Sequence, residues 1–196
     1  VYSRPAATRK GLSDGVSRKA NSAFSSGPVV STENEVLMGL PRQMFDLLRP
    51  HLRRVYVSKE QYIFQQDDQL DYVYFPETAV ASELHILDDG RMVEVSITGK
   101  EGAIGIATLF HADHIANCVQ VAQAGNVLKI ESSILKKLSK LHPELPLQLH
   151  STLEVYIRQI SQKAVCNMYH SVEERFCTWL LMVQDRAGTE QFALPQ

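Results

Sequence analysis

Helical periodicity dominates the stretch from Pro146 to about Met168. Apolar side chains recur there at steps of three or four residues, the spacing of one helix face: Leu149, Leu153, Tyr156, Ile160, Ala164 and Met168. A second apolar row, Ile157 and Val165, runs beside the first. A helix with two apolar sides needs two packing partners, and its own domain and a second copy of the chain would supply them. We therefore predict a dimerisation helix over 146–170, with the first row and Ile157 in the homodimer interface. A single buried helix of a monomeric core is the alternative.

Between Arg54 and Glu131 the pattern changes to short apolar or alternating segments, which are typical of strands. They are VYV at 55, YIF at 62, YVYF at 72, AVASELHIL at 79, MVEVSIT at 92, VQVAQ at 119 and VLKI at 127. Turn residues separate them, and Asp89-Gly90 between two alternating segments is a strong hairpin signal. Seven or eight short antiparallel strands without crossover helices predict a mainly β fold with flanking helices, built as a double-sheet jelly roll or barrel.

Helices are predicted on both sides of the strands. Two short ones lie within 34–52, with Asn34 as the N-cap of the first, and another spans 132–141. Ser171 and Glu174 have the spacing of a capping box for a last helix. The apolar residues of that last helix are Val172, Phe176, Trp179, Leu180 and Val183.

Composition places the chain among globular proteins. Its 196 residues are 44% hydrophobic, enough to bury a core, and its net charge of -2 shows no basic excess, so we expect this chain to bind DNA poorly. Cys118, Cys166 and Cys177 are too few and too scattered for a disulfide framework, and we expect small core residues in a reducing cytoplasm. No apolar run approaches the roughly 20 residues of a membrane span, and no signal peptide is visible at Val1. These features predict a soluble, cytoplasmic protein.

Seven short motifs follow one another along the chain. They are LP at 40, LRPHL at 48, VYFP at 73, DDGR at 88, GAIG at 102, LF at 109 and VEERFCTWLL at 172. In this order, and from Asn34 to Gln196, the chain resembles the Crp/Fnr family of bacterial transcription regulators. The resemblance implies a homodimer in which a cyclic-nucleotide-binding-like jelly roll senses a signal, a long helix joins the subunits, and a winged helix-turn-helix binds promoter DNA.

The resemblance also implies a division into four segments. Residues 1–32, rich in Ser, Ala and Gly, are expected to form a disordered tail. The jelly-roll sensor domain spans 33–145, and the dimerisation helix spans 146–170. Residues 171–196 begin a winged domain whose DNA-reading helix would follow later, so promoter DNA is a partner of the full-length protein. No membrane partner is expected.

The resemblance bears on the sensor pocket as well. Family members that bind cyclic nucleotides hold the ribose with a Glu and the phosphate with an Arg followed by Ser or Thr, beside a short helix that begins after a Gly. The motifs at 102 and 109 align Ile106 with that Glu and place Ala116 and Asn117 at the Arg and Ser positions. Without a charge-assisted phosphate contact, affinity falls about a hundredfold. We expect no cyclic AMP binding of the usual kind. Gly105, Ile106 and Asn117 then line a pocket that is vestigial or holds a different small effector.

Two polar residues of the long helix are further candidates for that pocket. Ser161 and Gln162 match the polar pair that reaches the nucleotide base in family members that bind nucleotides. A solvated helix face would carry the same two residue types, and that alternative stays open.

Metal or enzyme chemistry has little support in the sequence. His111 and His114 are spaced i, i+3 in a loop without a third ligand, and no group of four cysteines suggests an iron–sulfur cluster. Glu83 and His85, spaced i, i+2 on one strand face, are the single hint of a cupin-like metal enzyme. We expect no cofactor, no bound metal and no catalysis. The alternatives are a stand-alone ligand-binding jelly roll and the cupin-like enzyme.

Overall fold

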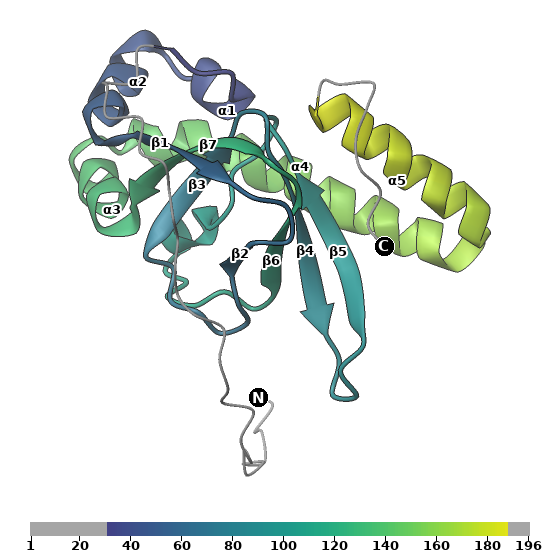
Figure 1. Cartoon of the computed structure of the whole chain (residues 1–196). Coiled ribbons are helices and arrows are strands. Elements are labelled where there is room, and N and C mark those ends of the chain that lie inside the picture. The colour runs from purple at the N-terminus through teal and green to yellow at the C-terminus, as the bar shows by residue number, and fades with distance from the viewer. Residues whose placement is uncertain (1–30, 188–196) are drawn as a thin grey trace.

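Seven antiparallel strands form two sheets in the part of the chain that the computed structural model describes, residues 31–187 (Figure 1). The three-stranded sheet has the order β1 (Arg53–Val57), β7 (Gly125–Glu131), β3 (Tyr72–Pro76). The four-stranded sheet has the order β2 (Tyr62–Phe64), β6 (Cys118–Gln123), β4 (Val80–Ile86), β5 (Met92–Thr98). The predicted mainly β fold with flanking helices is confirmed. The tail predicted for 1–32 falls almost entirely outside the described residues, as does the end of the chain from 188.

Five α-helices and two 3-10 segments accompany the strands within these residues. They are α1 (Glu35–Met38), α2 (Arg42–Leu48), η1 (Arg49–His51), η2 (Ile106–Phe110), α3 (Ser132–Leu141), α4 (Glu144–Tyr169) and α5 (Val172–Ala187). The predicted N-cap of α1 is present, because the Asn34 side chain accepts a hydrogen bond from the backbone N–H of Leu37 at 3.1 Å. The predicted capping box of α5 is present too: Ser171 N–H donates to Glu174, and Glu174 N–H donates to the Ser171 hydroxyl.

The long helix begins two residues earlier than the sequence indicated. Pro143 is the residue that precedes α4, and Pro146 falls in its first turn. Proline is tolerated there because the first backbone N–H groups of a helix have no partner within it. Proline therefore marks the start of the helix as predicted, but the helix begins about half a turn before Pro146.

The main core lies between the three-stranded sheet and the helices α1 to α4. Val73 and Phe75 of β3 and Leu128 of β7 are fully buried there. Leu149 of α4 is in the same core with no exposed surface. This corrects one sequence-based assignment: Leu149 was expected at a dimer interface, but its own domain covers it, because the first turns of α4 lie directly over the sheet.

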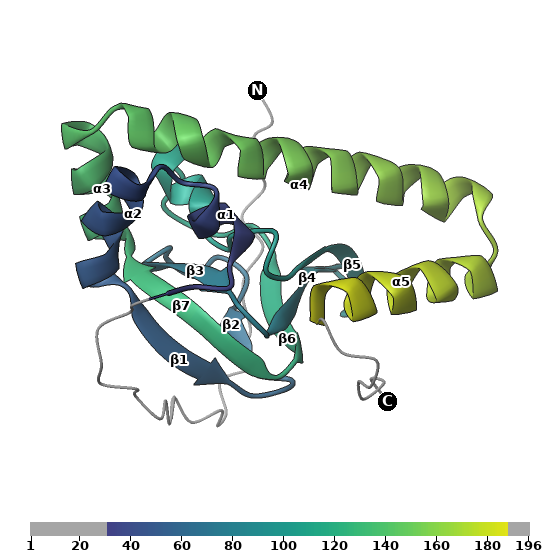
Figure 2. The same ribbon diagram turned by 90° about the horizontal axis from the view of Figure 1, so that it is seen from above.

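The second half of α4 projects beyond the roll, and α5 folds back beside it towards β4 and β5 (Figure 2). Val183 of α5 is 2% exposed and packs against Val80 and Ile97 on these strands. Arg186 adds an ion pair, its Nε lying 2.6 Å from Glu101 Oε1. The last described helix is thus docked on the sheet of its own chain.

The cysteines differ from one another in burial. Cys118 on β6 is buried as predicted, Cys166 on α4 is half-buried, and Cys177 on α5 is exposed. The expectation of three core cysteines is wrong for Cys177, because α5 covers the sheet with its opposite side.

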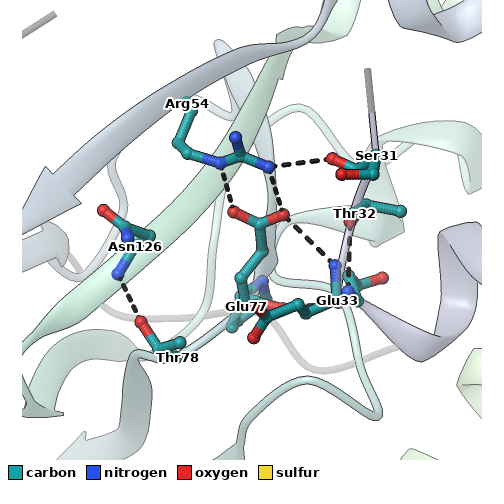
Figure 3. A network of polar contacts seen from close by, with 9 residues as sticks. Ser31, Thr32, Glu33, Arg54, Glu77, Thr78 and Asn126 are labelled. Carbon is teal, nitrogen blue, oxygen red and sulfur yellow. Dashed lines mark hydrogen bonds and ion pairs between the residues drawn. The ribbon is translucent and has the colours of Figure 1, made fainter. Parts of the chain in front are cut away.

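An ion pair ties the beginning of the described chain to the roll. Glu77, after β3, receives two hydrogen bonds from the Arg54 guanidinium of β1, at 2.6 and 2.8 Å (Figure 3). The same guanidinium donates to the carbonyl of Ser31, and Glu33 N–H donates to Glu77.

Candidate functional site

A cavity of about 330 Å³ opens between the roll and α4. Its walls come from β4, β6, the stretch 101–107 with the start of η2, the loop 112–117, and residues 152–159 of α4. This volume is at the small end of the roughly 300–1,000 Å³ typical of ligand pockets. The cavity therefore suits a small molecule.

Gly105 shapes the wall where η2 begins. Its φ of 82° lies in the left-handed region, which side chains disfavour. A Cβ at this position would also lie 2.8 Å from the backbone oxygen of Tyr72. Any other residue would be both strained and crowded here, so the predicted role of Gly105 in forming the turn has a physical basis.

The structure brings three of the five predicted effector-binding residues to the cavity. Gly105, Ile106 and Asn117 all line it, as does Ala116. Ile106 is only 6% exposed and also packs into the main core. An apolar side chain thus stands where the resemblance implied a Glu for the ribose.

The other two, Ser161 and Gln162, do not reach the cavity of their own chain. Both are exposed; the Ser161 hydroxyl donates to the Ile157 carbonyl at 2.9 Å, and Gln162 lies 3.3 Å from the Cys166 sulfur. Because an α-helix turns by about 100° per residue, Ser161 points about 200° away from Gln159, which does line the cavity. Their assignment to the same pocket was wrong within one chain.

Sequence reasoning missed the polar face of α4 that does line the cavity. Thr152, Tyr156 and Gln159 are spaced i, i+4, i+7 and share one side of the helix. Tyr156 was expected in the dimer interface, but its hydroxyl lies 2.7 Å from Glu83 Oε2 inside the domain. The i, i+4, i+7 spacing is present in the sequence, but Tyr156 was counted among the apolar residues of the helix, so its polar face was not predicted.

Glu83 of β4 is the centre of the polar contacts in the cavity. Its Oε2 accepts from the Tyr156 hydroxyl and from the Ser96 hydroxyl at 2.9 Å, and its Oε1 accepts from Asn117 Nδ2 at 2.8 Å. A register shift between Glu83 and Leu84 marks a bulge, an irregularity that often re-aims side chains at sites. Burial, and then the charge of Glu83, raises the pKa of Tyr156, so the phenol stays a donor.

Two polar atoms beside the cavity have no partner among the described residues. Thr152 is 7% exposed, and its hydroxyl makes no hydrogen bond. Glu101 uses Oε1 to accept from Arg186 and from the backbone N–H of Gly99, while its buried Oε2 accepts nothing. Both residues line the cavity. Buried polar atoms are nearly always hydrogen-bonded in native proteins, so these two are exceptions that call for an explanation.

No metal site is formed within residues 31–187, where no three His, Cys, Asp or Glu side chains converge. His111 and His114 are exposed loop residues. His85 and Glu83, the hint of a cupin-like site, are both hydrogen-bonded to the same Asn117 side chain. In the same residues, no helix is both long and apolar enough to cross a membrane.

The outer side of α4 is apolar and uncovered. Ile157 is 61% and Met168 75% exposed, and Ile160, Ala164 and Val165 are exposed as well. Leu153 is partly buried against the main core. Of the predicted interface residues, Ile157, Ile160, Ala164 and Met168 therefore remain available to a second chain.

One family model matches part of the chain. Residues 54–142 match the family described as the cyclic nucleotide-binding domain. No curated protein sequence matches the chain.

Solved structures share the fold over most of the chain at low sequence identity. The c-di-GMP-responsive global regulator CLP of Xanthomonas campestris is 16% identical with a TM-score of 0.63, covering 77% of this chain and 76% of CLP. FixK2 of Bradyrhizobium japonicum is 18% identical with a TM-score of 0.59, covering 69% and 67%. A protein of Eubacterium rectale assigned to the Crp/Fnr family of transcriptional regulators is 13% identical with a TM-score of 0.64, covering 79% and 73%.

Proposed function

The chain carries a cyclic nucleotide-binding domain and has the fold of Crp/Fnr regulators, and from this premise we propose that it is the sensor and dimerisation part of a DNA-binding transcription regulator. In this proposal the jelly roll holds a small effector in the cavity beside α4. The protein works in the cytoplasm as a homodimer, and a segment that follows α5 binds promoter DNA. Its role is regulatory, not catalytic.

The observation that carries the proposal is the uncovered apolar side of α4. Ile157, Ile160, Ala164 and Met168 follow one another at helical spacing on a helix whose opposite side is already packed on its own domain. Exposed apolar rows of this kind mark protein interfaces. A second copy is the occupant that fits, because two such helices related by a two-fold axis bury the same row on both.

The contacts of Glu101 support a path from the cavity to α5. Its side chain lines the cavity, and its Oε1 holds Arg186 near the end of α5. A ligand that engages Glu101 differently from water changes the strength of this ion pair and hence the docking of α5. Such coupling requires only about 1–3 kcal/mol to change DNA affinity from several-fold to about a hundredfold.

The molar mass in solution tests the dimer. Light scattering on the chain should give twice the 22.0 kDa of one chain, and Ile157→Glu should give the monomer. Leu141→Glu is the matched control, since Leu141 is an equally exposed apolar residue, 65% against 61%, on α3 outside the row. A wild-type monomer, or a dimer that survives Ile157→Glu, contradicts the proposed interface.

DNA binding is tested in the host organism by immunoprecipitation of chromatin with the protein produced from its own gene. Enriched fragments should contain two-fold symmetric sites with half-sites about 34–36 Å apart, one turn of DNA. Ile157→Glu should lose the enrichment and Leu141→Glu should keep it. An absence of enriched sites for the wild-type protein would count against a transcription regulator.

A further inference from the structure

Glu83 gives the cavity a negative charge that no Lys or Arg among the described residues balances. Among the described side chains that line it, Glu83 and Glu101 are carboxylates, His114 is an imidazole, and none is a Lys or Arg. Arg186 contacts Glu101 from α5 and is not part of the wall. A phosphate in this space would face the uncompensated Glu83 carboxylate in a region of reduced dielectric, where like charges repel strongly.

The Glu83 carboxylate is held in place by neutral donors only. Tyr156, Ser96 and Asn117 approach it from α4, β5 and the loop before β6. An ionised carboxylate offers about four acceptor positions, so three donors leave one position open. Within residues 31–187 no cation pairs with this charge, and a carboxylate removed from water gains most from a charged partner.

Thr152 and Glu101 add unsatisfied hydrogen-bonding capacity beside the same space. The Thr152 hydroxyl has no partner among the described residues, and Thr152 lies four residues, about 6 Å along the helix axis, before Tyr156, which contacts Glu83. Glu101 Oε2 also lacks a donor. Because both residues line the cavity, a molecule bound there is a source of the missing partners.

Much of the remaining wall is apolar, with Leu70, Ala81, Ile104, Ile115, Val119 and Leu153 among its side chains, while Thr98, His114 and Gln159 add polar groups. A molecule that fills the cavity therefore needs a compact apolar body as well as a group that donates hydrogen bonds.

We propose that the cavity binds a small organic cation, a protonated amine on an apolar body, in place of a cyclic nucleotide. The ammonium group faces the Glu83 carboxylate and supplies the missing partner of Thr152, while the apolar body fills the rest of the cavity. This inference rests on the proposed function, since it names the chemistry of the effector held in the same cavity.

Thermal unfolding of the intact chain with chosen probes provides the test. The probes are primary, tertiary and quaternary ammonium compounds with short aliphatic or aromatic bodies, among them 2-phenylethylammonium. The uncharged 2-phenylethanol and cyclic AMP serve as comparison compounds. Ligands that bind only the folded state raise the melting temperature. At least one ammonium compound should raise it, and neither comparison compound should.

Calorimetric titration of variants with the best ammonium probe locates the site. Glu83→Gln should weaken binding at least about tenfold, since the charge is lost. Thr152→Val keeps the side-chain shape and removes only an unpaired hydroxyl, so it should fold normally and bind several-fold more weakly. Glu154→Gln, an exposed carboxylate paired with Arg158 on the outer side of α4, should bind like the wild type.

The outcomes separate this inference from the proposed function. A shift with cyclic AMP and none with ammonium compounds overturns the cation site and supports sensing of a nucleotide. Binding that Glu83→Gln and Thr152→Val leave unchanged overturns it as well, and so does the absence of a shift with every probe. The proposal that the protein is a transcription regulator is tested separately, by the molar mass of the dimer and by the chromatin experiment.

Discussion

Glu77 and Glu83 are two carboxylates of the same roll with opposite kinds of surroundings. Glu77 is 4% exposed and receives both of its strongest hydrogen bonds from the guanidinium of Arg54, as Figure 3 shows. Glu83 receives three hydrogen bonds, all from neutral groups, and lines an open cavity. The guanidinium of Arg54 neutralises the Glu77 charge, whereas the neutral donors around Glu83 orient its carboxylate without neutralising it.

The difference separates a structural carboxylate from one that is available to a ligand. Arg54 and Glu77 compensate each other's desolvation, and the Glu77 hydrogen bond raises the pKa of Arg54. The pair joins β1 to the turn after β3. Glu101 is intermediate, since one oxygen is paired with Arg186 and the other with nothing. The loss in the free energy of unfolding should therefore be largest when the Arg54–Glu77 pair is broken, smaller when the Arg186–Glu101 pair is broken, and smaller again when the charge of Glu83 is removed.

Arg54→Met should have the largest effect. It leaves the buried Glu77 charge without a cation, and breaking such a pair should cost about 3 kcal/mol in the free energy of unfolding. Urea unfolding measures the loss. The double variant Arg54→Met, Glu77→Gln should recover part of it, because no charge is then left buried. A loss below about 0.5 kcal/mol would mean that Glu77 does not need a cation beside it for stability, and the contrast with Glu83 would be lost.

Arg186→Met should come next. It removes a charge-assisted hydrogen bond between side chains that are 12% and 25% exposed, worth about 2 kcal/mol, and should loosen α5. Amide hydrogen exchange should rise in α5 and stay unchanged in β7. Gly99→Ala tests the same docking by another route, since a Cβ there would lie 2.6 Å from the Cβ of Arg186. Unchanged α5 protection in both variants would refute the docking.

Glu83→Gln should cost less, about 1 kcal/mol, because its donors are neutral and remain partly satisfied by the amide oxygen. The same urea series measures it beside Arg54→Met. If Glu83→Gln were as costly as Arg54→Met, the contrast between the two carboxylates would be lost, and Glu83 would have to be regarded as structural.

The smallest effect appears only at alkaline pH. The folded state raises the pKa of Tyr156, so the contribution of this phenol is complete below the unfolded pKa of about 10 and is lost as pH rises above it. Stability of the wild type should fall more steeply above about pH 10 than that of Tyr156→Phe, by at most about 1.4 kcal/mol per pH unit. Tyr74, whose pKa burial raises to about 12, contributes equally to both. Parallel curves would contradict the pKa shift.

Local features of the fold were predictable because neighbouring residues decide them. Asn34 caps α1 through its own side chain, and the capping box of Ser171 and Glu174 forms within one turn. Gly90, with φ 85°, sits in the predicted hairpin between β4 and β5. Gly105, whose place in the pocket wall was inferred from the family resemblance and not from local physics, lines the cavity.

The candidate site was only partly predictable, because it depends on how elements rotate against each other. The periodicity of α4 identifies its apolar rows, but it does not say which row the sheet covers. Leu149 and Tyr156 therefore turned inwards, and Ser161 and Gln162 turned outwards, against expectation. The pair formed by Glu101 and Arg186, 85 residues apart, has no local signal at all.

By itself, the sequence determined the types and order of the helices and strands and the turns that connect them. Those properties follow from short-range sterics, hydrogen bonds between near neighbours, and the chemistry of single residues. Only the tertiary structure decided which carboxylate has a cation and which faces a cavity. Charge pairing depends on distances of a few ångströms between segments far apart in the chain, and packing alone sets those distances.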